Sequence, residues 1–468
     1  MSREASADDI GPRLPDGTPV VSLIDVERRE VSMRLFSDPA VFRAEQQWLF
    51  GRCWNIVGHE SEISEPGDFV VRRIAGDSVI VCRDRDGAVN VLLNMCRHRG
   101  MEVCRSEAGN TKSFVCPFHG WRYSPDGRLT GVPYQKELFG AEHDRRSLGL
   151  RTARVAVYAG IIFANWDEEA PPLAEYLGDF RWYLDLVFNR SKSGLECVGA
   201  PQRWVVRANW KLPSEQFIGG DAYHFTYTHR SLVEMRTQHG DDRGMAEALR
   251  GALHGMSVSS RLGHGMRANR RRAGGSGVLA GPSALEAGPD VDLREWFEQI
   301  PPRGMPREMT DELFQTLSPG QLTALATYPP GPGGMFPNCG FNHANLRVHL
   351  PIGPDSFEML NFVLVERDAP ADFKAQVRKD MLYGFGTSGL AEQDDVEVWC
   401  SVQARAAGAM GSQLTMSYRS SIEQNPPDWW PGPEQVRCGY TREDAAWRFW
   451  LRYRDYLSGR PIGGQADD

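Results

Sequence analysis

The sequence lacks the features of a nucleic-acid-binding, membrane or secreted protein. Its formal net charge is −8, so no basic excess is available to displace counterions from a nucleic acid. No apolar run approaches the roughly 18 residues that a membrane-spanning helix needs. The first nine residues are polar and acidic and do not resemble a signal peptide. We therefore expect a cytoplasmic protein with no nucleic-acid and no membrane partner.

The chain also lacks a disulfide framework and internal repeats. It has nine cysteines in 468 residues, and without a secretion signal these are expected to be reduced thiols or metal ligands. Its composition, 41% hydrophobic and 24% charged, is that of a globular protein. A chain of this length is too long for one simple core, so about two or three domains are expected.

Short strands separated by tight turns dominate the first half of the chain. Residues 69–71, 78–82 and 88–93 are β-rich runs bounded by Gly-Asp, Arg-Asp and Asp-Gly pairs. This pattern predicts a compact all-β domain over residues 53–168. Residues 1–52 are expected to form an arm and a helix capped by Ser37 or Asp38, packing with a larger domain over residues 169–468.

Two pairs of cysteine and histidine lie inside the predicted β domain. Cys96-Arg97-His98 is followed, after seventeen residues, by Cys116-Pro117-Phe118-His119. Two such pairs on separate loops can bind a [2Fe–2S] cluster, with two thiolates on one iron and two imidazoles on the other. A zinc site is the alternative, but the C-x-H pair is unlike the C-x₂₋₄-C of zinc fingers.

A second candidate metal site lies near the middle of the chain. Asp221, His224 and His229 fall within nine residues, and two imidazoles with one carboxylate are the minimal ligand set of a non-haem ferrous site. The two histidines are five residues apart, which is about 140° on a regular helix. A helix must therefore end or bulge between them if both bind one ion. The alternative is an amphipathic segment with two ordinary histidines.

From about residue 36 to about residue 457 the sequence resembles the large (α) subunit of Rieske-type non-haem iron aromatic-ring-hydroxylating dioxygenases. The motifs that carry the resemblance are C-x-H, then C-x-x-H-G-W, then Asp-x-x-His-x₄-His about a hundred residues later. The resemblance implies an α+β fold. The expected parts are an all-β Rieske [2Fe–2S] domain and a catalytic domain in which helices flank an antiparallel sheet.

The resemblance also implies a Rieske cluster and a mononuclear Fe(II). The third iron ligand is expected in the acidic helix motif at residues 392–399, where Asp395 aligns with the ligand and Asp394 is the alternative. In that scheme Asp221 does not bind iron, but bridges His224 to the cluster histidine His119 of an adjacent chain. Many relatives have Glu-Asn at Glu215-Gln216 and one residue fewer before the aspartate, so the role of Gln216 stays open.

The implied activity is cis-dihydroxylation of an aromatic ring with O₂ and two electrons from NAD(P)H, delivered by a ferredoxin or reductase. A ring of three α subunits, with or without three small β subunits, is the expected assembly. There are two alternatives to this activity. A Rieske monooxygenase or demethylase would have both sites, whereas an electron carrier would need only the β domain.

The residues around the iron motif predict an apolar aromatic substrate. Aromatic side chains and methionine suit a flat hydrocarbon, polycyclic ones included. Residues 340–350 alternate in polarity, which predicts one strand with Phe341, His343, Asn345, Arg347 and His349 on one face. Arg347 and the two histidines could hold a carboxylate, so an aromatic acid such as phthalate is the alternative substrate. The candidate pocket residues are Phe217, Phe225, Asn345, Arg347 and His349; other aromatic or methionine residues expected nearby are Tyr223, Tyr227, Met235, Phe336 and Phe385.

Overall fold

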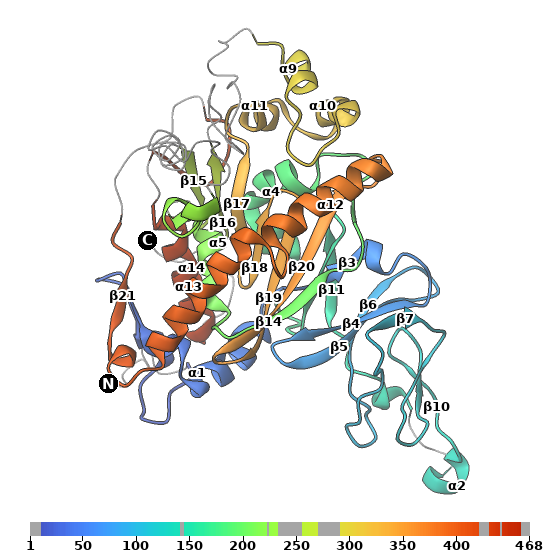
Figure 1. The fold of residues 1–468 in the computed structure, drawn as a ribbon. Coiled ribbons are helices and arrows are strands. Elements are labelled where there is room, and N and C mark those ends of the chain that lie inside the picture. The colour runs from blue at the N-terminus through green and yellow to red at the C-terminus, as the bar shows by residue number, and fades with distance from the viewer. Residues whose placement is uncertain are drawn as a thin grey trace, which may run out of the picture. The chain divides into compact units, whose positions relative to one another are not determined.

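The computed structural model describes residues 11–140, 145–221, 224–232, 255–269, 291–420, 430–439 and 442–459. Contacts within the chain divide it into two compact units (Figure 1). One, the β unit, is residues Leu49–Leu173; the larger unit joins Met1–Trp48 to Ala174–Asp468. Among the described residues, no helix is long and apolar enough to cross a membrane. Tyr223 and Met235 lie outside the described residues.

The β unit is built from three antiparallel sheets. Their strand orders are β6-β5-β4-β7, β10-β9-β8 and β11-β12-β3. The β4–β5 hairpin turns through Ala75 and Gly76, both with positive φ, as a two-residue turn that matches the strand twist requires. The strands are β3 (Asn55–His59), β4 (Asp68–Ile74), β5 (Asp77–Arg83), β6 (Val89–Leu93), β7 (Ala108–Asn110), β8 (Phe114–Val115), β9 (Arg122–Tyr123), β10 (Leu129–Gly131), β11 (Arg154–Tyr158) and β12 (Ile161–Asn165), with one short helix, α2 (Gln135–Phe139).

The larger unit is organised around a nine-stranded antiparallel sheet. Its order is β13-β20-β19-β18-β17-β16-β15-β22, with β14 also pairing with β20. A small separate sheet has the order β1-β2-β21. The main strands are β13 (Leu195–Cys197), β14 (Gln202–Val206), β15 (Gly255–Ser259), β16 (Gly265–Asn269), β17 (Pro330–Met335), β18 (Cys339–Asn342), β19 (Asn345–Gly353), β20 (Ser356–Glu366) and β22 (Gln435–Gly439); the small sheet has β1 (Ile24–Asp25), β2 (Glu30–Ser32) and β21 (Thr415–Ser417).

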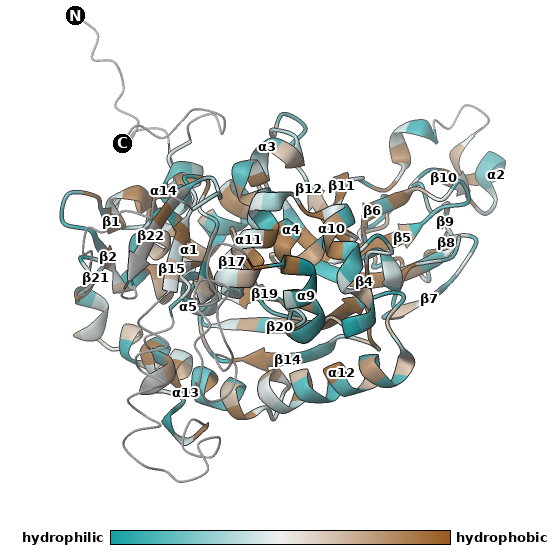
Figure 2. Ribbon diagram, turned by 90° about the horizontal axis from the view of Figure 1, so that it is seen from above, coloured by the Kyte–Doolittle hydropathy of each residue, from teal (hydrophilic) through white to brown (hydrophobic). Residues whose placement is uncertain are grey.

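Helices flank this sheet, so the expected α+β class is confirmed. Helix α5 contacts β16, β17, β18 and α14, while α12 contacts β20 and α13. Figure 2 shows α12 with both teal and brown turns, the colouring of an amphipathic helix. The helices are α1 (Pro39–Ala44), α3 (Leu173–Leu177), α4 (Arg181–Phe188), α5 (Lys211–Gly219), α9 (Leu293–Gln299), α10 (Leu313–Thr316), α11 (Pro319–Thr327), α12 (Ala371–Phe385), α13 (Leu390–Ala406) and α14 (Asp444–Leu457).

The N-terminal helix begins as its sequence predicts and ends in a buried ionic contact. The Asp38 carboxylate accepts the N–H of Ala40 (2.9 Å), with Pro39 in the first turn. A π-helical segment (Glu45–Phe50) follows. It places Glu45, 1% exposed, against the fully buried amine of Lys211 at the start of α5. This pair fixes the helix that leads into the histidine motif.

Helix α5 lies unusually close to the sheet because glycines face it. A Cβ on Gly340 would lie 2.7 Å from the Phe217 ring, and one on Gly334 would lie 2.7 Å from the Ile218 side chain. Real Cβ atoms essentially never approach that closely, so larger residues at these positions would push α5 off the strands. The glycines of β17 and β18 therefore set the height of the histidine motif above the sheet.

One sequence prediction about the sheet is wrong. Residues 340–350 do not form a single strand: β18 ends at Asn342, and Asn342 pairs with Asn345 across a tight hairpin turn. His343 occupies that turn with φ +56°, a left-handed conformation in which histidine is several-fold enriched. His343 therefore does not share a strand face with Arg347 and His349. The neighbouring strand expected at residues 357–366 is confirmed as β20, which pairs with β19.

Candidate active site

The histidine motif follows the abrupt end of α5. Gly220 caps the helix in the left-handed conformation (φ +59°), and a Cβ there would meet the backbone nitrogen of Arg267 at 2.8 Å. His224 then opens a 3₁₀ turn (His224–Thr226), and its carbonyl accepts the N–H groups of Tyr227 (2.9 Å) and Thr228 (2.7 Å). Helix α5 therefore ends before both histidines rather than between them, and non-α-helical turns link His224 to His229.

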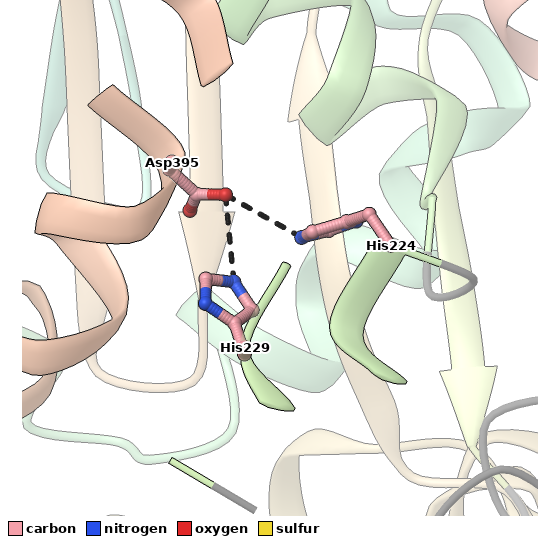
Figure 3. A group of neighbouring side chains, drawn as sticks. All are labelled: His224, His229 and Asp395. Atoms are coloured by element: carbon pink, nitrogen blue, oxygen red, sulfur yellow. Dashed lines mark ion pairs between the residues drawn. The ribbon is translucent and has the colours of Figure 1, made fainter. Parts of the chain in front are cut away.

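The turns after α5 bring His224 and His229 together with Asp395. The Asp395 Oδ1 atom lies 3.5 Å from His224 Nε2 and 3.4 Å from His229 Nε2. One ligand atom from each residue falls within 4.8 Å of the other two. Figure 3 shows the carboxylate on α13 facing both imidazole rings. Two imidazoles and one carboxylate converging on one point fit a six-coordinate metal with open positions.

Each histidine has a second carboxylate on its other nitrogen. Asp394 Oδ2 lies 3.1 Å from His229 Nδ1, and Asp221 Oδ2 lies 3.3 Å from His224 Nδ1. Burial alone would lower the pKa of His224, but the contact with Asp221 and the nearby Asp395 raise it. Carboxylates at Nδ1 hold both rings with Nε2 directed at Asp395.

Gln216 lies between the ligand residues, although nothing in the sequence pattern assigned it a role. Its Oε1 accepts the indole N–H of Trp399 (2.7 Å), so its amide nitrogen must face the other way. That nitrogen donates to Asp395 Oδ1 (3.0 Å) and lies 3.3 Å from His224 Nε2. Burial would raise the pKa of Asp395, but His229, His224 and Gln216 together lower it. Trp399 follows Asp395 by one helical turn, so both side chains lie on the same face of α13.

Arg347 is not available to a substrate carboxylate as the sequence suggested. Its Nη2 contacts Glu392 Oε2 at 2.8 Å, and both side chains are fully buried. Its guanidinium also lies over two rings, 4.8 Å from the centre of Phe217 and 5.2 Å from that of Phe385. Burial raises the pKa of the Glu392 carboxyl, and the Arg347 charge opposes the rise. The positive charge therefore already has an internal partner.

The remaining candidate pocket residues divide into two groups. Asn345 and His349 are fully buried beside Arg347 on β19, where Asn345 accepts the Arg347 Nε–H (3.1 Å). His349 Nδ1 lies 2.9 Å from Ser214 Oγ on α5, and burial together with Arg347 holds the pKa of His349 well below its usual range. Phe225, by contrast, is half-buried with its ring edge toward His229, 5.6 Å between centres.

In the β unit, the two Cys–His loops share one backbone pattern. In each, the cysteine N–H donates to the carbonyl five residues later, and the glycine four residues after the cysteine donates to the cysteine carbonyl. These bonds measure 2.8 and 2.9 Å in the Cys96 loop and 2.8 and 3.0 Å in the Cys116 loop. Gly100 and Gly120 adopt matching left-handed conformations, with φ +73° and +71°. The repeated turn presents two thiols and two imidazoles in related positions.

The side chains of these loops converge as a cluster site requires. His98 and His119 place their Nδ1 atoms 3.1 Å apart, close enough for both lone pairs to bind one iron. Burial raises the pKa of the Cys116 thiol, while the backbone N–H groups of Phe118 and His119 lower it. Such N–H groups aimed at a sulfur stabilise its thiolate. The thiol of Cys96 lies 3.3 Å from the hydroxyl of Tyr123, a contact that the sequence alone did not indicate.

Comparison with known proteins identifies the class. Residues 53–154 match the Rieske [2Fe-2S] domain family, and residues 173–459 match the family described as ring hydroxylating alpha subunit (catalytic domain). The chain therefore belongs to the ring-hydroxylating α-subunit family and is an oxidoreductase of the Rieske non-haem iron type. Its cofactors are accordingly a Rieske [2Fe–2S] cluster and a mononuclear iron.

Three relatives indicate the range of this family. The chain is 33% identical to biphenyl dioxygenase subunit alpha of Paraburkholderia xenovorans, over 92% of each chain. It is 30% identical to N,N-dimethyl phenylurea N-demethylase subunit alpha of Sphingobium sp., over 97% of this chain and 95% of the other. The crystal structure of naphthalene 1,2-dioxygenase from Rhodococcus sp. bound to indole is similar with a TM-score of 0.79, at 36% identity over 94% of this chain and 96% of the other.

Proposed function

We propose that this chain is the oxygenase α subunit of a dioxygenase that adds both atoms of O₂ to adjacent carbons of a neutral aromatic ring. The observation that carries the proposal is the convergence of His224, His229 and Asp395 on one point, in a chain that also presents paired Cys–His loops. The product is a cis-diol: two C–O bonds form and the O–O bond breaks. Two electrons from NAD(P)H and two protons balance the reaction.

In this proposal each set of ligands holds one centre. Cys96, His98, Cys116 and His119 hold the [2Fe–2S] cluster, and the triad of Figure 3 holds the iron. When bound, the cluster supplies single electrons and the iron supplies the open coordination positions at which O₂ chemistry occurs. The protein's part is to orient both triad imidazoles so that Nε2 faces the metal position, which the carboxylates at their Nδ1 atoms support.

Asp221 is proposed to link the two centres between subunits. It contacts His224, and 42% of its side chain is exposed, so an adjacent chain could reach its carboxylate. His119 is also exposed, and its free ring nitrogen would be the donor when it comes from an adjacent chain. This arrangement calls for a ring of three α subunits, with or without small β subunits. A ferredoxin or reductase would supply the electrons.

The burial and pairing of Arg347 favour a neutral aromatic substrate over an aromatic acid. The carboxylate hypothesis needed a cation on the β19 face, but Arg347 is fully buried and paired with Glu392. An aryl carboxylate would have to displace that pair and be desolvated beside two further acids, Asp394 and Asp395. The names of two relatives, biphenyl dioxygenase and naphthalene 1,2-dioxygenase, support a hydrocarbon, either monocyclic or polycyclic.

A demethylating monooxygenase is the second candidate, and one comparison favours it. The N-demethylase relative is nearly as similar to this chain as the biphenyl dioxygenase relative. A monooxygenase would place one oxygen atom in the substrate and release the other as water. Any substrate oxidised at nitrogen-bound methyl carbon would then yield formaldehyde rather than a diol.

The test is a matched pair of substrates supplied to the enzyme with a ferredoxin, a reductase and NADH. Naphthalene and 2-naphthoate share one ring system and differ by the carboxylate. We expect NADH-dependent O₂ uptake and a cis-diol with naphthalene, and no more than uncoupled background uptake with 2-naphthoate. Faster diol formation from 2-naphthoate would overturn the substrate class. An N,N-dimethyl phenylurea added in parallel tests the second candidate through formaldehyde release.

A further inference from the structure

We infer that Arg347 determines which acid of α13 serves the metal site: by holding Glu392, it leaves Asp395 as the carboxylate that faces the two histidines. Arg347 is thus a positioning residue rather than a substrate-binding residue. The inference rests on the proposed iron site and deepens it, because it concerns how one carboxylate, and not two, comes to face that site.

Two acids on α13, Glu392 and Asp395, are candidates to face the metal site. Glu392 and Asp395 are three residues apart on the buried face of the helix, so their side chains are neighbours. Glu392 is fully buried and Asp395 is 3% exposed. Both lie in the electrostatic field of His229, and they repel each other. Glu392 lies one turn before Asp395 and has a longer side chain, so it would be a second ligand unless another residue restrained it.

Arg347 is restrained independently of Glu392. The Phe217 and Phe385 rings both contact the guanidinium, and Nε–H donates to Asn345. Asn345 is bonded in turn to the Asn361 side chain on β20. Its strand, β19, is paired on both sides, with β18 and β20. The sheet therefore holds the Arg347 guanidinium in place, and the position of Glu392 is set by Arg347.

Removing Arg347 alone has a different consequence from removing both side chains. Without Arg347, the buried Glu392 carboxylate loses its counter-charge, and the nearest source of positive charge becomes the metal between the histidines. A second carboxylate there would occupy a coordination position that oxygen chemistry needs open. Without both side chains, an apolar pair of similar volume can fill the space at little cost, and Asp395 remains the acid that faces the histidines.

The experiment compares Arg347→Met, Glu392→Met and the double variant with the wild-type full-length enzyme. Protein containing its cluster but stripped of mononuclear iron is titrated with Fe(II) alone. Nitric oxide, which binds open positions of ferrous sites, is then titrated while the electron paramagnetic resonance signal is recorded. Neither measurement depends on turnover. His229→Ala serves as the control for the iron site itself.

We expect R347M to bind Fe(II) but to bind nitric oxide about tenfold more weakly, the size of effect usual for disturbed outer-shell contacts. E392M, and the double variant R347M/E392M, should match the wild type in nitric oxide affinity and signal shape. Should R347M not accumulate as folded protein, Arg347→Gln, which fills similar space without charge, is expected to shift nitric oxide affinity in the same direction.

Two results would overturn the inference: wild-type nitric oxide binding in R347M or its Gln substitute, or a double variant as impaired as the single. Failure of the proposed iron site would look different. In that case the wild type would take up no mononuclear Fe(II), or His229→Ala would take up as much as the wild type. The inference about Arg347 and the proposal for the iron site can therefore fail separately.

Discussion

Asp394 and Asp395 are adjacent acids whose substitutions are expected to weaken iron binding to different extents. Asp395 presents one oxygen to the Nε2 atoms of both histidines, whereas Asp394 contacts only the far nitrogen of His229, at 3.1 Å. We therefore expect Asp395→Asn to lose mononuclear iron, because a neutral amide is a poor substitute for a carboxylate ligand. Asp394→Asn should still bind iron, but with roughly 10–100-fold lower affinity, as for other outer-shell contacts to a ligating histidine.

That factor corresponds to about 1.4–2.7 kcal/mol of metal-binding free energy. The measurement is a titration of iron-depleted, cluster-containing enzyme with Fe(II) against a chromophoric chelator of known affinity. Glu397→Gln is the matched control, since Glu397 is an exposed acid on the same helix, and it should leave iron affinity unchanged. The reasoning is refuted if Asp394→Asn abolishes iron binding while Asp395→Asn retains it, because Asp394 would then be the ligand.

Three further predictions concern the assembly, the cluster and the fold. Mixing and reassembling Cys96→Ser subunits with Asp395→Ala subunits in equal amounts should restore about a quarter of wild-type diol formation, because random rings place an intact cluster beside a neighbour's intact iron site at that frequency. No recovery would mean that electrons pass from the cluster to the iron within one chain. Tyr123→Phe should lower the reduction potential of the cluster by about 40 mV, the equivalent of one lost hydrogen bond of about 1 kcal/mol to the Cys96 sulfur. An unchanged potential in a redox titration would exclude that bond. Glu45→Ala leaves the Lys211 amine buried without its carboxylate, so denaturant unfolding of the larger unit should show a loss of about 3–5 kcal/mol; a loss below 1 kcal/mol would mean that Lys211 is neutral or hydrated there.

The local motifs of both sites could be predicted from sequence because their chemistry is concentrated in short segments. Spacing alone indicated that one regular helix could not carry both His224 and His229, and in the structure α5 ends before His224 and a 3₁₀ turn begins there. The role of Gln216 could not be predicted in this way. Its orientation depends on Trp399, which is 183 residues away in the sequence.

A long-range contact explains why the expectation for Arg347 did not hold, and a local turn explains the outcome for His343. Arg347 alternates with apolar residues as a pocket-facing strand residue would, but Glu392 neutralises its charge from a helix that follows later in the chain. His343 continues the same alternation, yet it lies in a hairpin turn without the Gly or Asn-Gly signal that usually marks one. A polarity pattern indicates which side chains differ in polarity from their neighbours in the sequence, but it does not indicate what those side chains contact in the fold.

Oxygen labelling during turnover of naphthalene tests the central claim most directly. The enzyme, supplied with a ferredoxin, a reductase and NADH, is run under an atmosphere of equal parts ¹⁸O₂ and ¹⁶O₂, and the diol is analysed by mass spectrometry. If both oxygen atoms come from one O₂ molecule, the product contains only doubly labelled and unlabelled diol. Substantial singly labelled product, or a monohydroxylated ring with one labelled atom, would contradict the account of this chain as a dioxygenase.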